Sequence, residues 1–215
     1  MEKDLKEYRK SYEKGALLEV DLPENPLELF QSWFHLADES DSVEEANAMN
    51  ISTVGKDMMP VSRIVLLKSY DKDGFVFFTN YHSQKGKALL ENPYCCLSFF
   101  WPALEKQVII HGKATKISNK ESEEYFHSRP RGSQLGANAS EQSSSIASRE
   151  FLENKLKDLE QRYHNIEVPK PDNWGGYNVK PLKIEFWQGR SSRLHDRILY
   201  SSTSENKWKI ERLAP

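Results

Sequence analysis

The sequence is poor in cysteine and contains only Cys95 and Cys96, which are adjacent. Side chains of neighbouring residues in a strand point to opposite faces, so we expect no disulfide between them. Sparse cysteine is typical of a protein in a reducing compartment, and we expect a cytoplasmic location. The six histidines show no HExxH spacing and the chain has no CxxC pair, so the sequence predicts no metal site.

Long apolar runs and a large excess of one charge are also absent. No apolar run reaches the roughly eighteen residues of a membrane-spanning helix. The N-terminal residues alternate in charge, unlike the apolar core of a secretory signal peptide. With 30 basic and 32 acidic residues the formal net charge is −2. We therefore expect no nucleic-acid partner and no membrane partner, whereas a local pocket for a small anion is compatible with this charge.

The sequence also lacks the short motifs of several enzyme classes: GxGxxG after a strand, GxxxxGK[ST] and GxSxG. Dinucleotide-binding, P-loop and nucleophile-elbow chemistry therefore have no support. A chain of 215 residues can bury one substantial core. We find no internal repeat and predict one domain, with an arm (1–22), a helix and main strands (23–118), a helix and loops (119–173) and C-terminal strands (174–215).

Strand-like patterns dominate the first half of the chain. Asp71-Lys72-Asp73-Gly74 is a hairpin signal between two of them. Trp174–Gly176 is predicted to break the chain before the final strands. Five strands with short connections suggest a closed or nearly closed antiparallel barrel. The predicted strands are 48–54, 61–69, 75–80, 94–101 and 106–116, followed by 182–188, 193–200 and 207–213.

Helix start signals occur at three places. Asn25 caps a helix with Pro26 at its first position, and Ser83 can cap a short helix. Ser118 and Glu121 form a capping box for a helix that ends at Arg129. These local signals predict helices beginning near residues 26, 84 and 119.

Three further segments are less sharply defined. Residues 2–14 are predicted to form a short charged helix or an arm. Residues 149–164 should form an amphipathic helix that buries an apolar face. The segment 131–148 is rich in Ser, Gly and Gln, and is either a linker or a loop whose hydroxyls and amides bind a ligand. The predicted buried face of the helix consists of Phe151, Leu152, Leu156 and Leu159.

The stretch 185–197 combines a Trp, a Gly, three arginines and a His. If 192–200 is a strand, Arg193, His195 and Arg197 share one face. Two cations beside an imidazole suit an anionic ligand that needs a proton-handling neighbour. The alternative is a solvated strand whose arginines pair with nearby carboxylates.

Other candidate anion donors are dispersed along the chain. Arg63 and Lys68 are five residues apart, so in a flat strand they serve two anions or require a bend. Lys85 lies in the first turn of a predicted helix, where backbone N–H groups favour a phosphate. Tyr125 and Arg129 are four residues apart on one predicted helix face. Taken singly, each of these cations is more often an ordinary surface side chain, and only their number favours a site.

Several motifs occur together in an order and spacing that identify a family. They are RIVLLK (63–68), FFTNYHSQKG (77–86), NPYCCLSFFWPALEKQV (92–108), YFHSRPRGSQLGANAS (125–140), WGGY (174–177) and EFWQGRSSRLHDR (185–197). From about residue 8 to residue 215 the chain resembles the FMN-dependent pyridoxine (pyridoxamine) 5′-phosphate oxidases. The resemblance implies a mainly β fold with flanking helices, an FMN-binding split β-barrel. It further implies a homodimer with two FMN sites at the subunit interface.

The resemblance also implies roles for individual residues. Arg193 and His195 would be the catalytic residues, lying over the pyridine ring, and Arg63 with Lys85 would hold the FMN phosphate. The implied flavin contacts are Arg63, Ile64, Val65, Leu66, Leu67, Lys68, Phe78, Thr79, Gln84, Lys85, Gln107, Gln142, Ser143, Trp187 and Arg197. The implied substrate contacts are Arg9, Lys10, Ser11, Tyr12, Lys68, Tyr125, Arg129, Ser133, Arg193, Leu194 and His195. Of these, Lys68, Tyr125, Arg129 and Ser133 would hold the substrate phosphate.

The sequence departs from the family pattern at two places. Gln84 stands where the family often has Arg beside the phosphate-binding Lys, which removes one charge near FMN. Lys10 and Ser11 replace a more usual Arg-Glu pair in the arm that can fold over the substrate. Neither departure changes Arg193 or His195.

The activity implied by the resemblance is oxidation of the 4′ carbon of pyridoxamine or pyridoxine 5′-phosphate to pyridoxal 5′-phosphate, a vitamin B6 cofactor. A hydride passes to flavin N5, and O₂ accepts the electrons to give H₂O₂, with ammonia released from the amine. The alternatives are another split-barrel flavin oxidoreductase and a carrier that binds FMN or pyridoxal phosphate without turnover.

Overall fold

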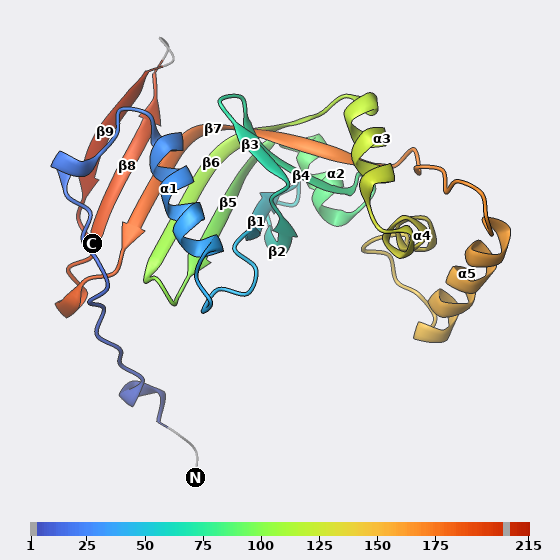
Figure 1. Cartoon of the computed structure of the whole chain (residues 1–215), viewed down its shortest axis with the longest axis horizontal. Helices are drawn as coiled ribbons and strands as arrows, with labels where there is room; N and C mark the ends of the chain where they lie inside the picture. The colour runs from blue at the N-terminus through green and yellow to red at the C-terminus, as the bar shows by residue number, and fades with distance from the viewer. Residues whose placement is uncertain (1–3, 204–206) are drawn as a thin grey trace. The chain divides into compact units, whose positions relative to one another are not determined.

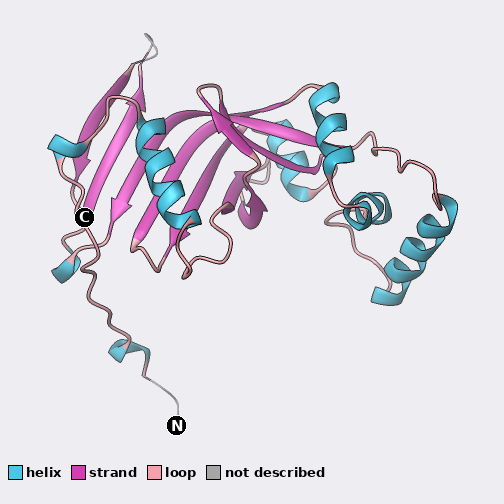
Figure 2. Cartoon of the chain, viewed as in Figure 1, coloured by secondary structure: helices cyan, strands magenta, loops and turns pink. Residues whose placement is uncertain are grey.

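The computed structural model describes residues 4–203 and 207–215. Within them the chain is mainly β with flanking helices (Figure 2). The strands are β1 (Ala48–Val54), β2 (Pro60–Leu66), β3 (Ser69–Asp71), β4 (Gly74–Asn80), β5 (Tyr94–Trp101), β6 (Lys106–Lys116), β7 (Trp174–Gln188), β8 (Asp196–Ser202) and β9 (Trp208–Leu213). The helices are α1 (Pro26–Asp38), α2 (Gln84–Glu91), α3 (Asn119–Ser128), α4 (Arg131–Ala139) and α5 (Arg149–Arg162), with short 3₁₀ turns at Leu5–Glu7, Glu19–Asp21 and Ser191–Arg193.

The described strands join in one sheet, in the order β2-β1-β5-β6-β7-β4-β3, with β8 pairing to β7 and β9 to β8. The pairs β3–β4, β4–β7, β7–β8 and β8–β9 are antiparallel. The predicted hairpin at Asp71–Gly74 is confirmed, since Asp71 and Gly74 face each other in the register of β3 and β4. The long strand β7 lies between β6 and β4, an insertion that the sequence pattern did not predict.

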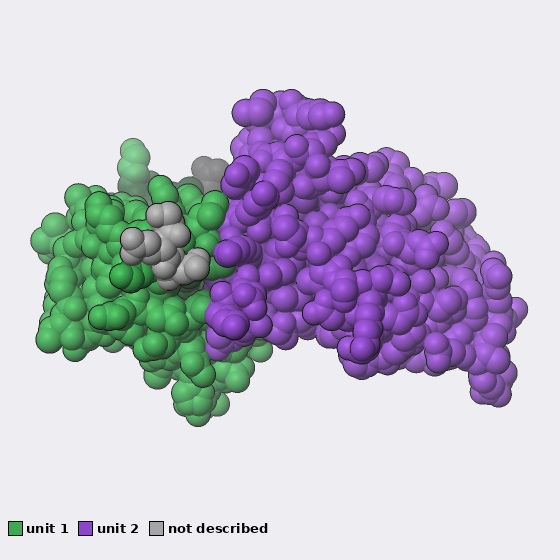
Figure 3. Space-filling view, turned by 90° about the horizontal axis from the view of Figure 1, so that it is seen from above, with its two compact units in different colours: residues 1–50, 96–111, 181–215 green, residues 51–95, 112–180 purple. Residues whose placement is uncertain are grey.

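The chain divides into two compact units (Figure 3). Unit 1 consists of residues 1–50, 96–111 and 181–215, and unit 2 of residues 51–95 and 112–180. Strands β1, β5, β6 and β7 contribute residues to both units. None of the described helices is long and apolar enough to cross a membrane.

The core of unit 1 is aromatic. Helix α1 lies over the sheet (Figure 1), and Phe30 packs against Phe99 of β5 with ring centroids 5.3 Å apart. Trp33 meets Phe186 of β7 at 5.2 Å. The predicted start of this helix is confirmed, because Asn25 accepts the N–H of Leu27 at 3.1 Å. Aromatic burial therefore fixes α1 against β5 and β7.

A smaller core in unit 2 consists of Phe126, Leu135, Val168 and Trp174. It joins α3, α4 and the start of β7. The capping box at Ser118 and Glu121 is present, as predicted for α3. The apolar face predicted for α5 is wrong in part, because Phe151 is exposed and no residue of α5 is fully buried. Leu156 and Leu159 of that face do pack against the core.

Four further predictions require correction. The strand predicted at 61–69 is interrupted after Leu66, which supplies the bend required between Arg63 and Lys68. The segment 131–148 begins with helix α4 and is therefore neither a linker nor a loop over its first nine residues. Trp174–Gly176 belongs to β7 and does not break the chain. Of the two alternatives for residues 2–14, the helix is wrong except at Leu5–Glu7 and the segment is an arm, of which residues 2 and 3 lie outside the described part of the chain.

The strand predicted over 192–200 also starts later than expected. Ser192 and Arg193 have φ values of 55° and 61°, in the left-handed region, and β8 begins at Asp196. Arg193 and His195 therefore lie in a turn, and the predicted shared strand face with Arg197 is wrong. The turn is decided by the backbone conformation at two non-glycine residues, which a two-residue periodicity cannot reveal.

Candidate active site

The first cation pair of unit 2 is formed by Arg63 of β2 and Lys85 of α2. The Lys85 side chain is 6% exposed. Its Nζ donates to Thr79 Oγ1 at 3.1 Å and to Gln142 Oε1 at 2.9 Å. Burial, followed by repulsion from Arg63, lowers the pKa of Lys85 to about 8. Among the described residues, neither side chain hydrogen-bonds to a carboxylate that would offset its charge, so the pair is suited to an anion.

Arg63 itself has an unused donor. Its Nη1 donates to Thr53 Oγ1 at 2.7 Å and to the Val61 carbonyl at 2.9 Å. Its Nη2 is buried and has no hydrogen-bond partner. A buried guanidinium nitrogen without a partner costs free energy unless a ligand accepts from it. Arg63 is therefore positioned to bind a ligand oxygen.

The start of α2 is held unusually close to the end of β4. Ser83 caps the helix by accepting the N–H of Gly86 at 3.3 Å. A Cβ atom on Gly86 would lie 2.2 Å from the carbonyl oxygen of Tyr81. Only glycine permits this approach, and the approach brings the neighbouring Lys85 beside Thr79. Lys85 lies in the first turn of α2, and the N-terminal turn of a helix favours phosphate.

A second cation in unit 2, Arg129, lines a separate cavity of about 320 Å³. Its guanidinium lies 4.7 Å from the centre of the Trp174 ring, and its Nη1 is buried without a partner. Burial lowers the pKa of Arg129, but an arginine stays protonated at neutral pH. Ser133 of α4 lines the same cavity. A fixed cation and a hydroxyl again provide donors for an anion.

The shared helix face predicted for Tyr125 and Arg129 is wrong, because α3 ends at Ser128, although Tyr125 still lies close enough to act electrostatically on Arg129. Arg129 follows the end of α3 with extended backbone angles. Tyr125 does not line the cavity with it; its ring stacks on Phe78 at 3.9 Å between centroids. Gln142 does line the cavity and also binds Lys85, so it connects the two cation sites. That connection had no signal in the sequence.

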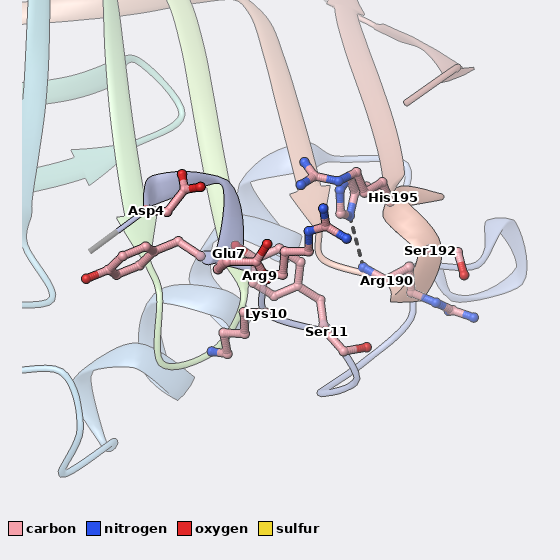
Figure 4. Close-up of a pocket in the computed structure, with 11 residues that line it drawn as sticks. Asp4, Glu7, Arg9, Lys10, Ser11, Arg190, Ser192 and His195 are labelled. Carbon is pink, nitrogen blue, oxygen red and sulfur yellow. Dashed lines mark hydrogen bonds between the residues drawn. The ribbon is translucent and has the colours of Figure 1, made fainter. Parts of the chain in front are cut away.

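In unit 1 the N-terminal arm and the turn before β8 enclose a cavity of about 940 Å³ (Figure 4). The cavity is lined by Arg9, Lys10, Ser11 and Tyr12 of the arm, and by Arg190, Ser192, Arg193 and His195. The structure thus brings together the predicted arm residues and both predicted catalytic residues. Leu194, predicted beside them, is exposed and does not line the cavity.

The imidazole of His195 is held by an aromatic cluster and one hydrogen bond. Its ring lies 4.7 Å from that of Trp187 and 5.7 Å from that of Tyr12. The backbone N–H of Arg190 donates to His195 Nδ1 at 3.1 Å. Nδ1 is therefore the acceptor, and in the neutral ring the proton is on Nε2.

Arg197 is already paired within its own subunit. Its Nε donates to Glu185 Oε1 at 2.7 Å, and its Nη1 donates to the Ala214 carbonyl at 2.9 Å. The hydrogen bond that Arg197 donates to the Glu185 carboxylate raises the pKa of Arg197. Gln107 is likewise bonded, to Ser98 at 3.1 Å. Their predicted contacts with flavin stay predictions.

The remaining predicted flavin and substrate residues differ in exposure. Leu67 is buried, whereas Ile64, Lys68, Gln84 and Ser143 are exposed. Val65 and Leu66 are half-buried. Within the described chain, the exposed members line neither the Arg129 cavity nor the His195 cavity. No group of three His, Cys, Asp or Glu side chains in the described residues is arranged to hold a metal ion.

Sequence profiles of two families match the chain. The profile described as pyridoxamine 5′-phosphate oxidase matches residues 37–163. The profile described as pyridoxine 5′-phosphate oxidase C-terminal dimerisation region matches residues 174–215.

Individual proteins give the same result. A pyridoxine/pyridoxamine 5′-phosphate oxidase of Christiangramia forsetii is 67% identical over 215 residues, an alignment that covers 100% of both chains. One of Flavobacterium psychrophilum is 55% identical over 213 residues, 99% of this chain and 100% of its own length.

Two solved structures are also similar. The crystal structure of PhzG from Burkholderia lata 383 in complex with tetrahydrophenazine-1-carboxylic acid has a TM-score of 0.86 and 29% identity, covering 93% of this chain and 98% of its own. A pyridoxamine 5′-phosphate oxidase-related, FMN-binding protein from Nostoc punctiforme has a TM-score of 0.69 at 16% identity, covering 87% and 96%. The second likeness shows the shared fold, an antiparallel split barrel.

Proposed function

Because this chain belongs to the pyridoxamine 5′-phosphate oxidase family of FMN-dependent oxidoreductases, we propose that it oxidises pyridoxamine and pyridoxine 5′-phosphate to pyridoxal 5′-phosphate with O₂. The alcohol and O₂ give the aldehyde and H₂O₂. The amine, O₂ and water give the aldehyde, ammonia and H₂O₂. In both reactions a hydride leaves the 4′ carbon and a proton leaves the hydroxyl or amino group that it carries.

One observation carries the proposal. Unit 2 contains two buried guanidinium nitrogens without partners, Arg63 Nη2 and Arg129 Nη1. Each belongs to a cation set with hydroxyl or ammonium donors beside it. Two such sets suit two phosphorylated molecules, a phosphorylated cofactor and a phosphorylated substrate. An oxidoreductase of the same fold with an unphosphorylated substrate would need only one such cation set, for the cofactor.

The residues around Lys85 fit the phosphate of FMN. Arg63 Nη2, the Lys85 ammonium and the N-terminal turn of α2 would be the donors to it. Thr79 Oγ1 and Gln142 Oε1 accept from Lys85 and fix its position. When bound, FMN supplies the hydride acceptor and transfers the electrons to O₂. Gln84 stands where the family often has Arg. Its side chain is exposed, so this difference leaves the donors named above intact.

The cavity of Arg129 fits the phosphate of the substrate. Arg129 Nη1 and the Ser133 hydroxyl are its donors, and the Trp174 ring forms one wall. Holding the phosphate far from the reacting carbon orients that carbon and replaces a bimolecular encounter by a positioned one. Removal of the phosphate should therefore weaken binding and turnover together.

Arg193 and His195 are proposed to orient the pyridine ring and its substituents. The tautomer of His195 directs an Nε2–H donor away from Arg190. The Arg193 side chain is exposed and lines the same cavity. Neither residue needs to form a covalent intermediate, because the cofactor performs the redox step.

The match of residues 174–215 to a dimerisation region supports a homodimer. Exposed large apolar side chains on unit 2, including Met58, Met59, Ile64 and Leu90, are compatible with a partner surface. We propose that FMN binds at the subunit interface, with the Lys85 set from one chain and Arg197 from the other. Arg197→Ala should then weaken FMN binding before it changes chemistry.

The decisive activity test mixes the FMN-loaded protein with pyridoxamine 5′-phosphate, and separately with pyridoxine 5′-phosphate, in air. Formation of the aldehyde, followed by its near-ultraviolet–violet absorbance, with an equal amount of H₂O₂ supports the oxidase. Consumption of NAD(P)H without aldehyde indicates a flavin reductase. Binding of both molecules with neither product indicates a carrier.

The interface proposal has its own test. Lys85→Met and Arg197→Ala proteins are mixed, dissociated and reassociated. If each FMN site uses both residues from different chains, half of the dimers are mixed and each has one intact site, restoring about a quarter of wild-type FMN binding. No recovery above that of the separate variants would contradict sites shared between subunits.

A further inference from the structure

Glu105 is a buried acidic residue outside both cation sites. It lies in the turn between β5 and β6, is 2% exposed, and has a left-handed φ of 57°. Its Oε2 accepts the backbone N–H groups of Glu13 at 2.7 Å and Lys14 at 2.9 Å. Its Oε1 lies 3.5 Å from the Nζ of Lys10. The carboxylate is therefore bound mainly by the backbone of the N-terminal arm.

The backbone of Glu105 makes a second set of contacts. Its carbonyl oxygen accepts the N–H of Gly189 at 2.8 Å and the Nε2 of Gln188 at 3.1 Å. Gln188 ends β7, and Gly189 opens the turn that carries Arg193 and His195. One residue thus joins the arm to the start of the His195 turn.

The segment held by Glu105 is the part of the arm that lines the His195 cavity. Tyr12 lies one residue before Glu13, and its ring centroid is 5.7 Å from His195. A Cβ atom on Gly189 would lie 2.8 Å from Tyr12 Cγ, so the tyrosine packs directly on the backbone of this glycine. Arg9 of the arm also lines this cavity (Figure 4).

The charge state of Glu105 suits this role. Burial raises the pKa of its carboxyl, but hydrogen bonds from the backbone of Lys14 and Glu13 and the charge of Lys10 together hold the pKa below its usual value. The carboxylate is therefore ionised at neutral pH. Charge-assisted hydrogen bonds to backbone N–H groups are among the stronger ones in proteins.

We propose that Glu105 is a positioning residue that anchors the N-terminal arm over the His195 cavity and thereby sets the affinity for the phosphorylated pyridine substrate. This inference rests on the proposed function for its kinetic consequence. Its structural part, the anchoring of the arm, does not depend on the activity. The simpler alternative is that Glu105 only stabilises the β5–β6 turn.

Two variants separate these possibilities. Glu105→Gln keeps the volume and one acceptor oxygen but loses the charge, and Glu105→Ala removes both acceptors. In the FMN-loaded protein we expect KM for pyridoxine 5′-phosphate to rise about 3-fold for Gln and about 10-fold or more for Ala. We expect kcat to change less than about 2-fold and FMN to stay bound. Glu24→Gln, which changes an exposed carboxylate of unit 1 that does not line the cavity, is the control and should leave KM unchanged.

Limited trypsin digestion measures directly how firmly the arm is held. Cleavage after Arg9, Lys10 and Lys14 should accelerate about 10-fold in Glu105→Ala and less in Glu105→Gln, while cleavage elsewhere stays slow. If Glu105→Ala does not fold, Glu105→Gln provides the comparison. Unchanged arm cleavage in a folded variant would overturn the anchor, whether or not the wild-type protein oxidises pyridoxine 5′-phosphate.

A double-mutant cycle with Tyr12→Ala tests the route through the arm. If Glu105 acts by positioning Tyr12, the second substitution should add little to the first. The KM of the double variant should then equal the higher of the two single-variant KM values within about 2-fold. If the KM increases of the two single variants instead multiply in the double variant, Glu105 acts independently of the arm, and the proposal is overturned. Failure of wild-type turnover would instead reject the proposed function and leave the digestion result to decide the anchor.

Discussion

The backbone N–H of Arg190 donates to Nδ1 of His195 at 3.1 Å, across a turn with left-handed residues at Ser192 and Arg193. This bond closes the turn and leaves Nε2–H as the donor of the neutral imidazole. Trp187 and Tyr12 hold the ring on two sides. The sequence of the turn thus controls both the direction and the tautomer of the proposed catalytic histidine.

His195→Ala should lower kcat/KM for pyridoxine 5′-phosphate by about 10- to 100-fold, because one oriented hydrogen bond to the substrate is lost. FMN content should be unchanged. Steady-state kinetics and the flavin absorbance of the purified protein measure the two effects. His35→Ala, at an exposed histidine of α1, is the control. Loss of flavin with unchanged single-turnover chemistry would contradict the assignment.

Lys85→Met should raise the Kd for FMN by about 10- to 100-fold, since a buried charge-assisted contact to phosphate is removed. Quenching of flavin fluorescence during titration of the FMN-free protein measures it. Lys87→Met changes an exposed lysine of the same helix and should have little effect. Equal effects of the two substitutions would argue against a phosphate site at Lys85.

The lowered pKa of Lys85, about 8, gives a pH dependence with a definite sign. Below pH 8 the Lys85 side chain is charged in the FMN-free protein. Above pH 8 it is mostly neutral there, so FMN binding must be accompanied by uptake of a proton. The Kd for FMN should therefore rise as the pH increases above about 8, by up to tenfold per pH unit, and Lys85→Met should lack this rise. The same pKa makes the FMN-free protein gain stability between pH 8 and 10.5, where the unfolded chain binds more protons.

Arg129→Met should raise KM for pyridoxine 5′-phosphate by about 10- to 100-fold while leaving the slow oxidation of unphosphorylated pyridoxine unchanged. The comparison isolates the phosphate contact, because both substrates present the same ring. Arg149→Met, at an exposed arginine of α5, is the control. An equal loss with both substrates would place Arg129 outside the phosphate site.

Asp196 connects three segments of unit 1: it accepts from the N–H of Leu17 at 3.0 Å, from Arg190 at 3.2 Å and from Arg212 at 2.8 Å. Asp196→Asn should lower the free energy of unfolding by about 1–3 kcal/mol and Tm by roughly 5 °C. It should also reduce turnover by loosening the His195 turn. Thermal unfolding measures the first effect, and Glu211→Gln, in an exposed pair with Lys209, should shift Tm by less than about 2 °C.

The parts of the fold predicted correctly depend on short-range chemistry. Asn25 and Ser118 cap their helices because each side chain reaches a backbone N–H within the next three residues. Strands β5 and β6 have the bounds predicted from their aromatic and β-branched residues. Helix α4 was missed because Pro130 provides no side-chain cap and the helix is stabilised by burial of Leu135 against the α3 core.

By itself the sequence determined the family and the elements whose signals are local, and the motif order supplied the candidate residues. Only the tertiary structure decided which of them meet. Glu105 and Glu13 are 92 residues apart, and Gln142 binds Lys85 across 57 residues. Contacts at such separations depend on how strands pair and turns bend, and these follow from burial of the whole core and not from any neighbouring residue.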